Sequence, residues 1–254
     1  MTGTVDIRTL SREERRGLLA GPKVTLTRGG SFFAEVHKRA FMATSMWANG
    51  RIQARGTISV LELPPSASRA DTQALKIVIG WLSSLGGDNI RPIPMGANTV
   101  EACKIYHAAT ALGMRLHVSH IAAYFHSYIE DHSTIPTYEE LDAMQAAFHP
   151  DTKVYKHLVK DLAHRRHKKQ IPDMKDFEAY LKKQPTLARA LDEIDAKYIA
   201  DRKAAKEAVK AHLRERRADE RRADEKEEQR RREEFEAGLK AARGGRAGGY
   251  GMGV

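Results

Sequence analysis

Alternating apolar and polar residues near the front of the chain predict a β-hairpin. Residues 24–27 and 32–36 both alternate, with Phe32, Ala34 and Val36 assigned to one face, and Gly29-Gly30 lies between the two segments. This alternation is typical of strands with one buried face, and paired glycines can adopt the positive φ of a tight turn. A third strand is predicted over 57–63, so we expect a small sheet.

Apolar residues at helical spacing predict helices between and after these strands. One predicted helix opens at Ser68-Arg-Ala-Asp71, which resembles a capping box. Residues 90–95 contain two prolines, so any strand there would be an edge strand. The helix that opens at Asn98 is apolar almost all round, so it belongs in the core. Its partner follows from Met114, with a buried set that includes Leu116 and Tyr128. The predicted helices of this region are 38–48, 71–85, 98–113 and 114–129.

From residue 136 onward the pattern predicts only helices. The last of them begins near Thr186 and contains no aliphatic residue larger than alanine between Arg214 and Glu234. A coiled coil needs apolar positions sustained over several heptads, so this stretch is not one. Opposite charges three and four residues apart stabilise a single helix in solvent. We therefore expect a long, charged, solvated helix.

These patterns divide the chain into five parts and predict the α+β class. The front is a polar, loose leader with a short helix at 11–20, and the end is rich in glycine and expected to be disordered. The five predicted parts are the leader (1–20), a folded domain (21–133), a helical extension (134–185), the charged helix (186–242) and the tail (243–254).

The charge and cysteine content narrow the class of protein. The net charge is +10, and residues 151–183 contain ten Lys and Arg against five Asp and Glu. A basic balance permits contact with nucleic acid or an anionic membrane. The single cysteine excludes an internal disulfide, and we find neither a secretory signal nor an apolar run of membrane-spanning length. We expect a protein of the nucleus or cytoplasm.

Three segments in order resemble a known family. They are Val24–Lys38, Ala40–Trp47 and Val100–Met114. The first two are similar to its strand, hairpin, Val-His-Lys, helix, serine and aromatic segment, here with His37, Lys38, Ser45 and Trp47. The third is similar to a late helix with an Ala-Ala-x-x-Leu-Gly-Met run. Residues 22–130 therefore resemble a divergent BTB/POZ domain of the kind found in fungal proteins.

This resemblance implies a protein-protein interaction fold that is often homodimeric and that needs no catalysis and no cofactor. We expect an adaptor or scaffold that docks a partner or a second copy of itself. The chain lacks G-x-S-x-G, Walker and H-E-x-x-H motifs, so the sequence gives no support to an enzyme.

Cys103, His107, His117 and His120 have spacings that a zinc site could use. A cysteine in an apolar helix is more often a core residue, so we expect no metal site.

Two basic features support an alternative function as an RNA- or chromatin-associated protein. The first is the run His164, Arg165, Arg166, His167, Lys168 and Lys169, with Lys160 and Lys153 upstream, interpreted as an import signal or a phosphate-binding patch. The same run is also explained as a solvated helix end, where cations are favoured by the helix dipole. The second is the tail, where Arg243, Arg246 and Tyr250 are candidate RNA contacts. A plain flexible terminus explains the tail equally well.

Overall fold

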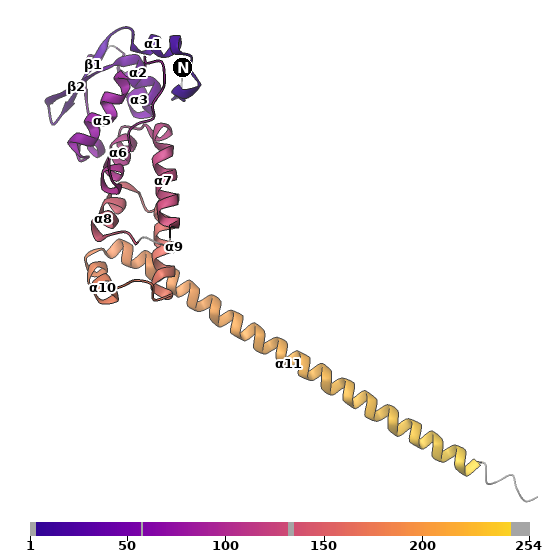
Figure 1. Ribbon diagram of the computed structural model, residues 1–254. Coiled ribbons are helices and arrows are strands. Elements are labelled where there is room, and N and C mark those ends of the chain that lie inside the picture. Colours follow the sequence, from indigo (N-terminus) through magenta and orange to yellow (C-terminus); the bar gives the residue numbers. More distant parts are fainter. Residues whose placement is uncertain (1–3, 57, 132–134, 245–254) are drawn as a thin grey trace, which may run out of the picture. The chain divides into compact units, whose positions relative to one another are not determined.

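A computed structural model describes residues 4–56, 58–131 and 135–244 (Figure 1). The protein combines one small sheet with a largely helical chain, so the α+β prediction is confirmed. The chain forms two compact units, residues 1–191 and residues 192–254. The first unit contains the sheet and all helices up to the beginning of the last one.

The sheet has three strands in the order β2-β1-β3, and the predicted hairpin is confirmed. β1 (Lys23–Arg28) and β2 (Ser31–His37) are antiparallel, and β3 (Val60–Glu62) runs parallel to β1. Gly29 and Gly30 have φ values of 61° and 76°, which a residue with a side chain rarely adopts.

One face of this sheet is buried and the other faces solvent. Val24, Leu26 and Val36 are at most 2% exposed on the inner face. On the outer face, the Glu62 carboxylate accepts hydrogen bonds from the backbone N–H groups of Gly29 and Gly30, at 2.6 and 3.4 Å. It also accepts one from the Thr27 hydroxyl. Glu62 therefore joins the hairpin turn to β3.

The predicted helix 38–48 is wrong in one respect, because it is two helices. α2 (Lys38–Thr44) ends at Ser45, whose backbone is extended with ψ of 113°, and α3 (Met46–Arg55) begins directly after it. The Ser45 hydroxyl accepts a hydrogen bond from the N–H of Ala48 at 2.9 Å. Serine is a strong N-cap because it satisfies a free N–H of the first turn. The cap therefore divides the predicted helix.

The helices that follow β3 agree with the predictions, apart from details of their ends. Asp71 caps α5 by accepting from the Ala74 N–H, and Ser68 instead ends the short α4, so the predicted capping box is wrong. Asn98 caps α6 as expected. Residues 90–95 are irregular rather than an edge strand. The helices are α4 (Pro65–Ser68), α5 (Thr72–Ser83), α6 (Thr99–Ala111) and α7 (Ser119–Glu130), with the short η2 (Arg115–Val118) before α7.

α6 lies in the core, but two residues predicted to be buried after it are not. Six of its thirteen residues are buried. Leu116 is 49% exposed, because η2 turns it outward before α7 begins, and Tyr128 is half-buried. The predicted burial of these two residues is therefore wrong.

The leader is not loose over residues 4–20. It forms η1 (Ile7–Thr9) and α1 (Arg12–Leu19), and Ile7 is fully buried. Arg15 is 5% exposed, and its guanidinium donates hydrogen bonds to the carbonyls of Leu10 and Leu85, at 2.8 and 3.1 Å. A buried arginine is stable only when its N–H groups are satisfied. Arg15 therefore anchors the leader to the loop that follows α5.

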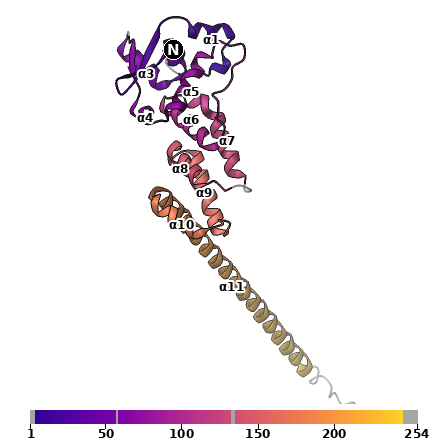
Figure 2. The same cartoon turned by 60° about the vertical axis from the view of Figure 1, so that its left-hand side comes forward.

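The helical extension packs on the front of the chain. It consists of α8 (Tyr138–Ala147), α9 (Lys153–His167) and α10 (Met174–Lys183). α8 packs against α6 and α9 against α7, as Figure 2 shows for the stack of helices. Phe148, which ends α8, contacts the rings of Tyr106 and Phe125, with centroid distances of 4.5 and 5.0 Å. The helical extension therefore shares a core with the front of the chain.

The final helix, α11 (Pro185–Gly244), contains 60 residues. Leu187 and Leu191, in its first two turns, are fully buried in the first unit. In the second unit the described side chains from 199 to 239 are almost all exposed. Ion pairs one turn apart, such as Arg231–Glu227 and Arg232–Glu228 at 2.7 Å, follow the predicted charge pattern.

Candidate interaction surfaces

Three of the four residues of the family motif have hydrogen bonds or ring contacts within the fold. Lys38 donates from Nζ to the carbonyl of Gly56 at 3.2 Å, and Trp47 packs edge-on against Phe41 at 6.0 Å. His37 ends β2, and its buried Nδ1 has no partner within the described part of the chain. Ser45 caps α3. Lys38, Ser45 and Trp47 therefore make contacts that stabilise the fold.

Two of the motif segments meet in space although they are far apart in sequence. The Ser45 hydroxyl donates to the carbonyl of Leu112, and the Met46 N–H donates to the carbonyl of Gly113 at 3.2 Å. A Cβ atom on Gly113 would lie 2.9 Å from the Trp47 nitrogen, and the φ of Gly113 is +77°. This position therefore requires glycine for both space and backbone conformation.

The outer face of the sheet exposes two large apolar side chains. Phe32 is 69% exposed and Val60 is 56% exposed. The strand pattern assigned Phe32 to the inner face with Ala34 and Val36, and this assignment is wrong. The register shifts beyond Leu26, so that Phe32 lies opposite Thr27 on the outer face. A β-bulge moves the following side chains to the other face, and alternation in the sequence cannot reveal it.

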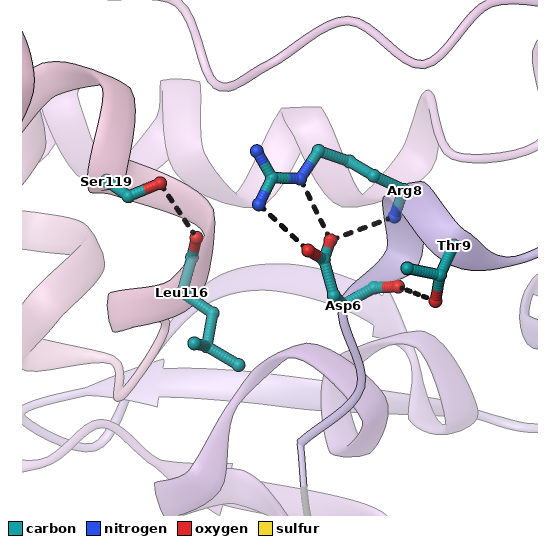
Figure 3. A network of polar contacts seen from close by, with 5 residues as sticks. All are labelled: Asp6, Arg8, Thr9, Leu116 and Ser119. Atoms are coloured by element: carbon teal, nitrogen blue, oxygen red, sulfur yellow. Dashed lines mark hydrogen bonds and ion pairs between the residues drawn. The ribbon is translucent and has the colours of Figure 1, made fainter.

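Leu116, another exposed apolar residue, is drawn in Figure 3 together with the Asp6–Arg8 pair of the leader. The guanidinium of Arg8 donates to both carboxylate oxygens of Asp6, at 2.9 and 2.8 Å, and the Arg8 N–H donates to the same carboxylate. These bonds lower the pKa of Asp6 to about 2. The sequence patterns did not identify this surface, because it joins the leader to η2.

The predicted basic cluster at 164–169 is not a continuous patch. Arg165 is only 3% exposed, and its Nε donates to the carboxylate of Asp161 at 2.6 Å. It also donates to the carbonyl of Asp131 at 3.4 Å. An arginine held in this way cannot reach a ligand, so including it among the exposed residues was wrong. His164, Lys168 and Lys169 are exposed.

The exposed face of α9 extends this positive charge toward the beginning of the helix. Lys153, Lys156 and Lys160 are all exposed. Beside this row, the Nδ1 atoms of His157 on α9 and His126 on α7 share a hydrogen bond of 3.0 Å. The sequence interpretation centred on 164–169, where the charges are consecutive, and noted Lys153 and Lys160 upstream. The helical spacing that adds Lys156 to these two lysines was the signal for the larger surface.

The cysteine and histidines of the candidate zinc site have other environments. Cys103 is 1% exposed, and burial raises the pKa of its thiol to about 12. His117 packs against Trp81 at 5.3 Å, where burial lowers its pKa. The His120 Nε2 contacts the carbonyl of Ile93 at 2.9 Å. The described residues contain no group of three metal-ligating side chains.

An apolar cavity of about 350 Å³ lies among α8, α9 and α10. Leu141, Leu162 and Phe177 contribute to its walls, and Tyr138, Asp173 and Asp176 also line it. Tyr138 is 41% exposed and stacks on Tyr180 at 4.6 Å. Apolar walls with carboxylates and an aromatic ring suit an apolar group that carries a positive charge.

The candidate RNA contacts of the tail, Arg243, Arg246 and Tyr250, lie outside the described side chains. Among the described residues, no helix has the length and apolar character needed to cross a membrane. Comparison with protein families, curated proteins and solved structures finds no match to this chain.

Proposed function

We propose that the chain is a non-enzymatic adaptor or scaffold, in which a BTB/POZ-like domain at residues 21–133 associates with itself or docks a partner. The observation that carries this proposal is the order of elements over 23–130: β1, glycine turn, β2, α2, α3, β3, α4, α5, α6 and α7. The three segments that carry the resemblance lie along these elements in the expected order. The contacts of Ser45 and Met46 with Leu112 and Gly113 support it, because they join two of the three motif segments.

The outer face of the sheet is the surface that we assign to docking. Phe32 and Val60 lie on this face on the two outer strands, with Thr25 and Thr27 of the central strand between them. Both are large and more than half exposed. Burying an apolar side chain of this size against a partner contributes about 1.5 to 3 kcal/mol. A surface with two such residues is suited to a protein partner or a second copy.

The last helix acts as a spacer in this proposal. A helix of 60 residues is about 90 Å long at 1.5 Å per residue. Its ion pairs stabilise it without a partner helix, each by about 0.2 to 0.5 kcal/mol. Two binding elements at the ends of such a helix would be held far apart.

Sedimentation of the full chain and recovery of bound proteins test this function. The variant Phe32→Ser with Val60→Ser should lose most of the self-association or partner recovery of the unaltered chain. The matched control is Ile199→Ser with Val209→Ser, which removes two exposed apolar side chains from α11. This control should behave like the unaltered chain. A full chain that sediments as a monomer and retains no protein would refute the proposal.

A further inference from the structure

Every residue on the solvent side of α9 is a lysine or a histidine. At 3.6 residues per turn, these six residues occupy an arc of about 100°. Five of them are exposed and His157 is half-buried. The other nine residues of the helix comprise Arg166 and eight that are buried. The six residues of this basic face are Lys153, Lys156, His157, Lys160, His164 and His167.

The basic face has no acidic residue to neutralise it on its own helix. Asp161 is the single acid of α9, whose fifteen residues are all described. It is 7% exposed and holds Arg165 on the buried side. The pair removes one positive and one negative charge from the surface together. The charge that remains on the solvent side is therefore entirely positive.

We propose that this basic face, centred on Lys153, Lys156 and Lys160, binds the phosphate backbone of a nucleic acid. The row from Lys153 to His164 is about 16 Å long at 1.5 Å per residue. A nucleic-acid strand with one phosphate per 3.4 Å presents about five phosphates over that length. Lysine chains are long and flexible, so three of them can each reach a phosphate.

The buried side of α9 favours a nucleic acid over a membrane surface. A helix that lies in a membrane interface inserts an exposed apolar face beneath the headgroups. The apolar residues of α9, among them Val154, Leu158 and Leu162, are at most 4% exposed within the first unit. The helix therefore offers phosphates a charged surface but has no apolar side chains for insertion. Lys168 and Lys169, both exposed, extend the positive surface beyond the end of α9.

Binding of labelled oligonucleotides to the full chain, followed by fluorescence anisotropy, tests the basic face. Single-stranded RNA and duplex DNA serve as probes over a series of salt concentrations. The variant with Lys153, Lys156 and Lys160 changed to Gln should bind at least about tenfold more weakly at low salt. The slope of log affinity against log salt should fall by about 2 for the single strand, because each phosphate contact contributes about 0.7.

A matched control changes the same number of charges elsewhere in the first unit. Lys175, Lys182 and Lys183 are exposed lysines of α10, and changing them to Gln also removes three positive charges. This control should keep the affinity and slope of the unaltered chain. A further variant, with Arg243→Gln and Arg246→Gln, measures the contribution of the tail.

Four results would overturn the inference. They are no binding at low salt, equal losses in the α9 and α10 variants, loss with the tail variant alone, and binding to phosphatidylserine vesicles without binding to the oligonucleotides. Circular dichroism of each variant distinguishes lost contacts from lost folding. None of these outcomes bears on association through the sheet, so the two proposals succeed or fail separately.

Discussion

At the scale of single residues, burial decides whether a charged side chain is accessible to a ligand. Arg165 belongs to the most basic run of the chain, yet it is buried against Asp161. Lys160 lies upstream of that run and is exposed to solvent. Sequence reasoning located the positive charge correctly in this region but counted consecutive residues. A helix presents residues three and four apart on one face, so the periodic positions define the surface.

Removing one partner of the buried pair should destabilise the first unit strongly. Changing Asp161→Asn leaves the guanidinium of Arg165 buried without its counter-charge. Breaking such a pair costs about 3 to 5 kcal/mol. Urea unfolding of the full chain, followed by circular dichroism, should show this loss. Lys168→Ala, on an exposed residue nearby, should change the unfolding free energy by less than about 0.5 kcal/mol. Equal stability of the two variants would contradict a structural role for the pair.

At the scale of elements, periodicity predicted most helices and the hairpin, because their faces differ clearly in polarity. Periodicity did not predict two local interruptions of the helix and strand patterns. The cap at Ser45 divides one predicted helix, and the bulge beyond Leu26 turns Phe32 outward. The Ser45 hydroxyl also donates to the carbonyl of Leu112, which is distant in the sequence. Phe32 matters most for the proposed docking surface, and its position could not be derived from alternation.

The contact of α2 and α3 with the end of α6 should not tolerate a side chain at Gly113. Gly113→Ala places a Cβ against the Trp47 backbone and forces a positive φ, so we expect a loss of more than about 1 kcal/mol. Gly50, in α3, has open space where its Cβ would lie. Gly50→Ala should therefore stabilise the chain by about 0.5 to 1 kcal/mol. Thermal unfolding should show a lower melting temperature for Gly113→Ala and a higher one for Gly50→Ala. An unchanged melting temperature for Gly113→Ala would contradict the close approach of Gly113 to Trp47.

At the scale of the whole molecule, the sequence predicted a domain, a helical extension and a charged helix from residue 186, and the first compact unit ends at Leu191. Compositional change marks the helix clearly, because its apolar residues become sparse after Leu213. The helices at 138–183 have modest apolar faces, and nothing local shows that Phe148 completes the core beside Phe125. The unit that should be isolated is therefore 1–191 and not 21–133.

Affinity capture with the full chain, residues 1–191 and residues 192–254 tests the central claim most directly. Each is produced with the same tag and exposed to a differently tagged full chain and to proteins of its own source. An adaptor that works through the front domain predicts that residues 1–191 retain what the full chain retains, and that residues 192–254 retain none of it. Retention by residues 192–254 alone, or by none of the three, would contradict the account.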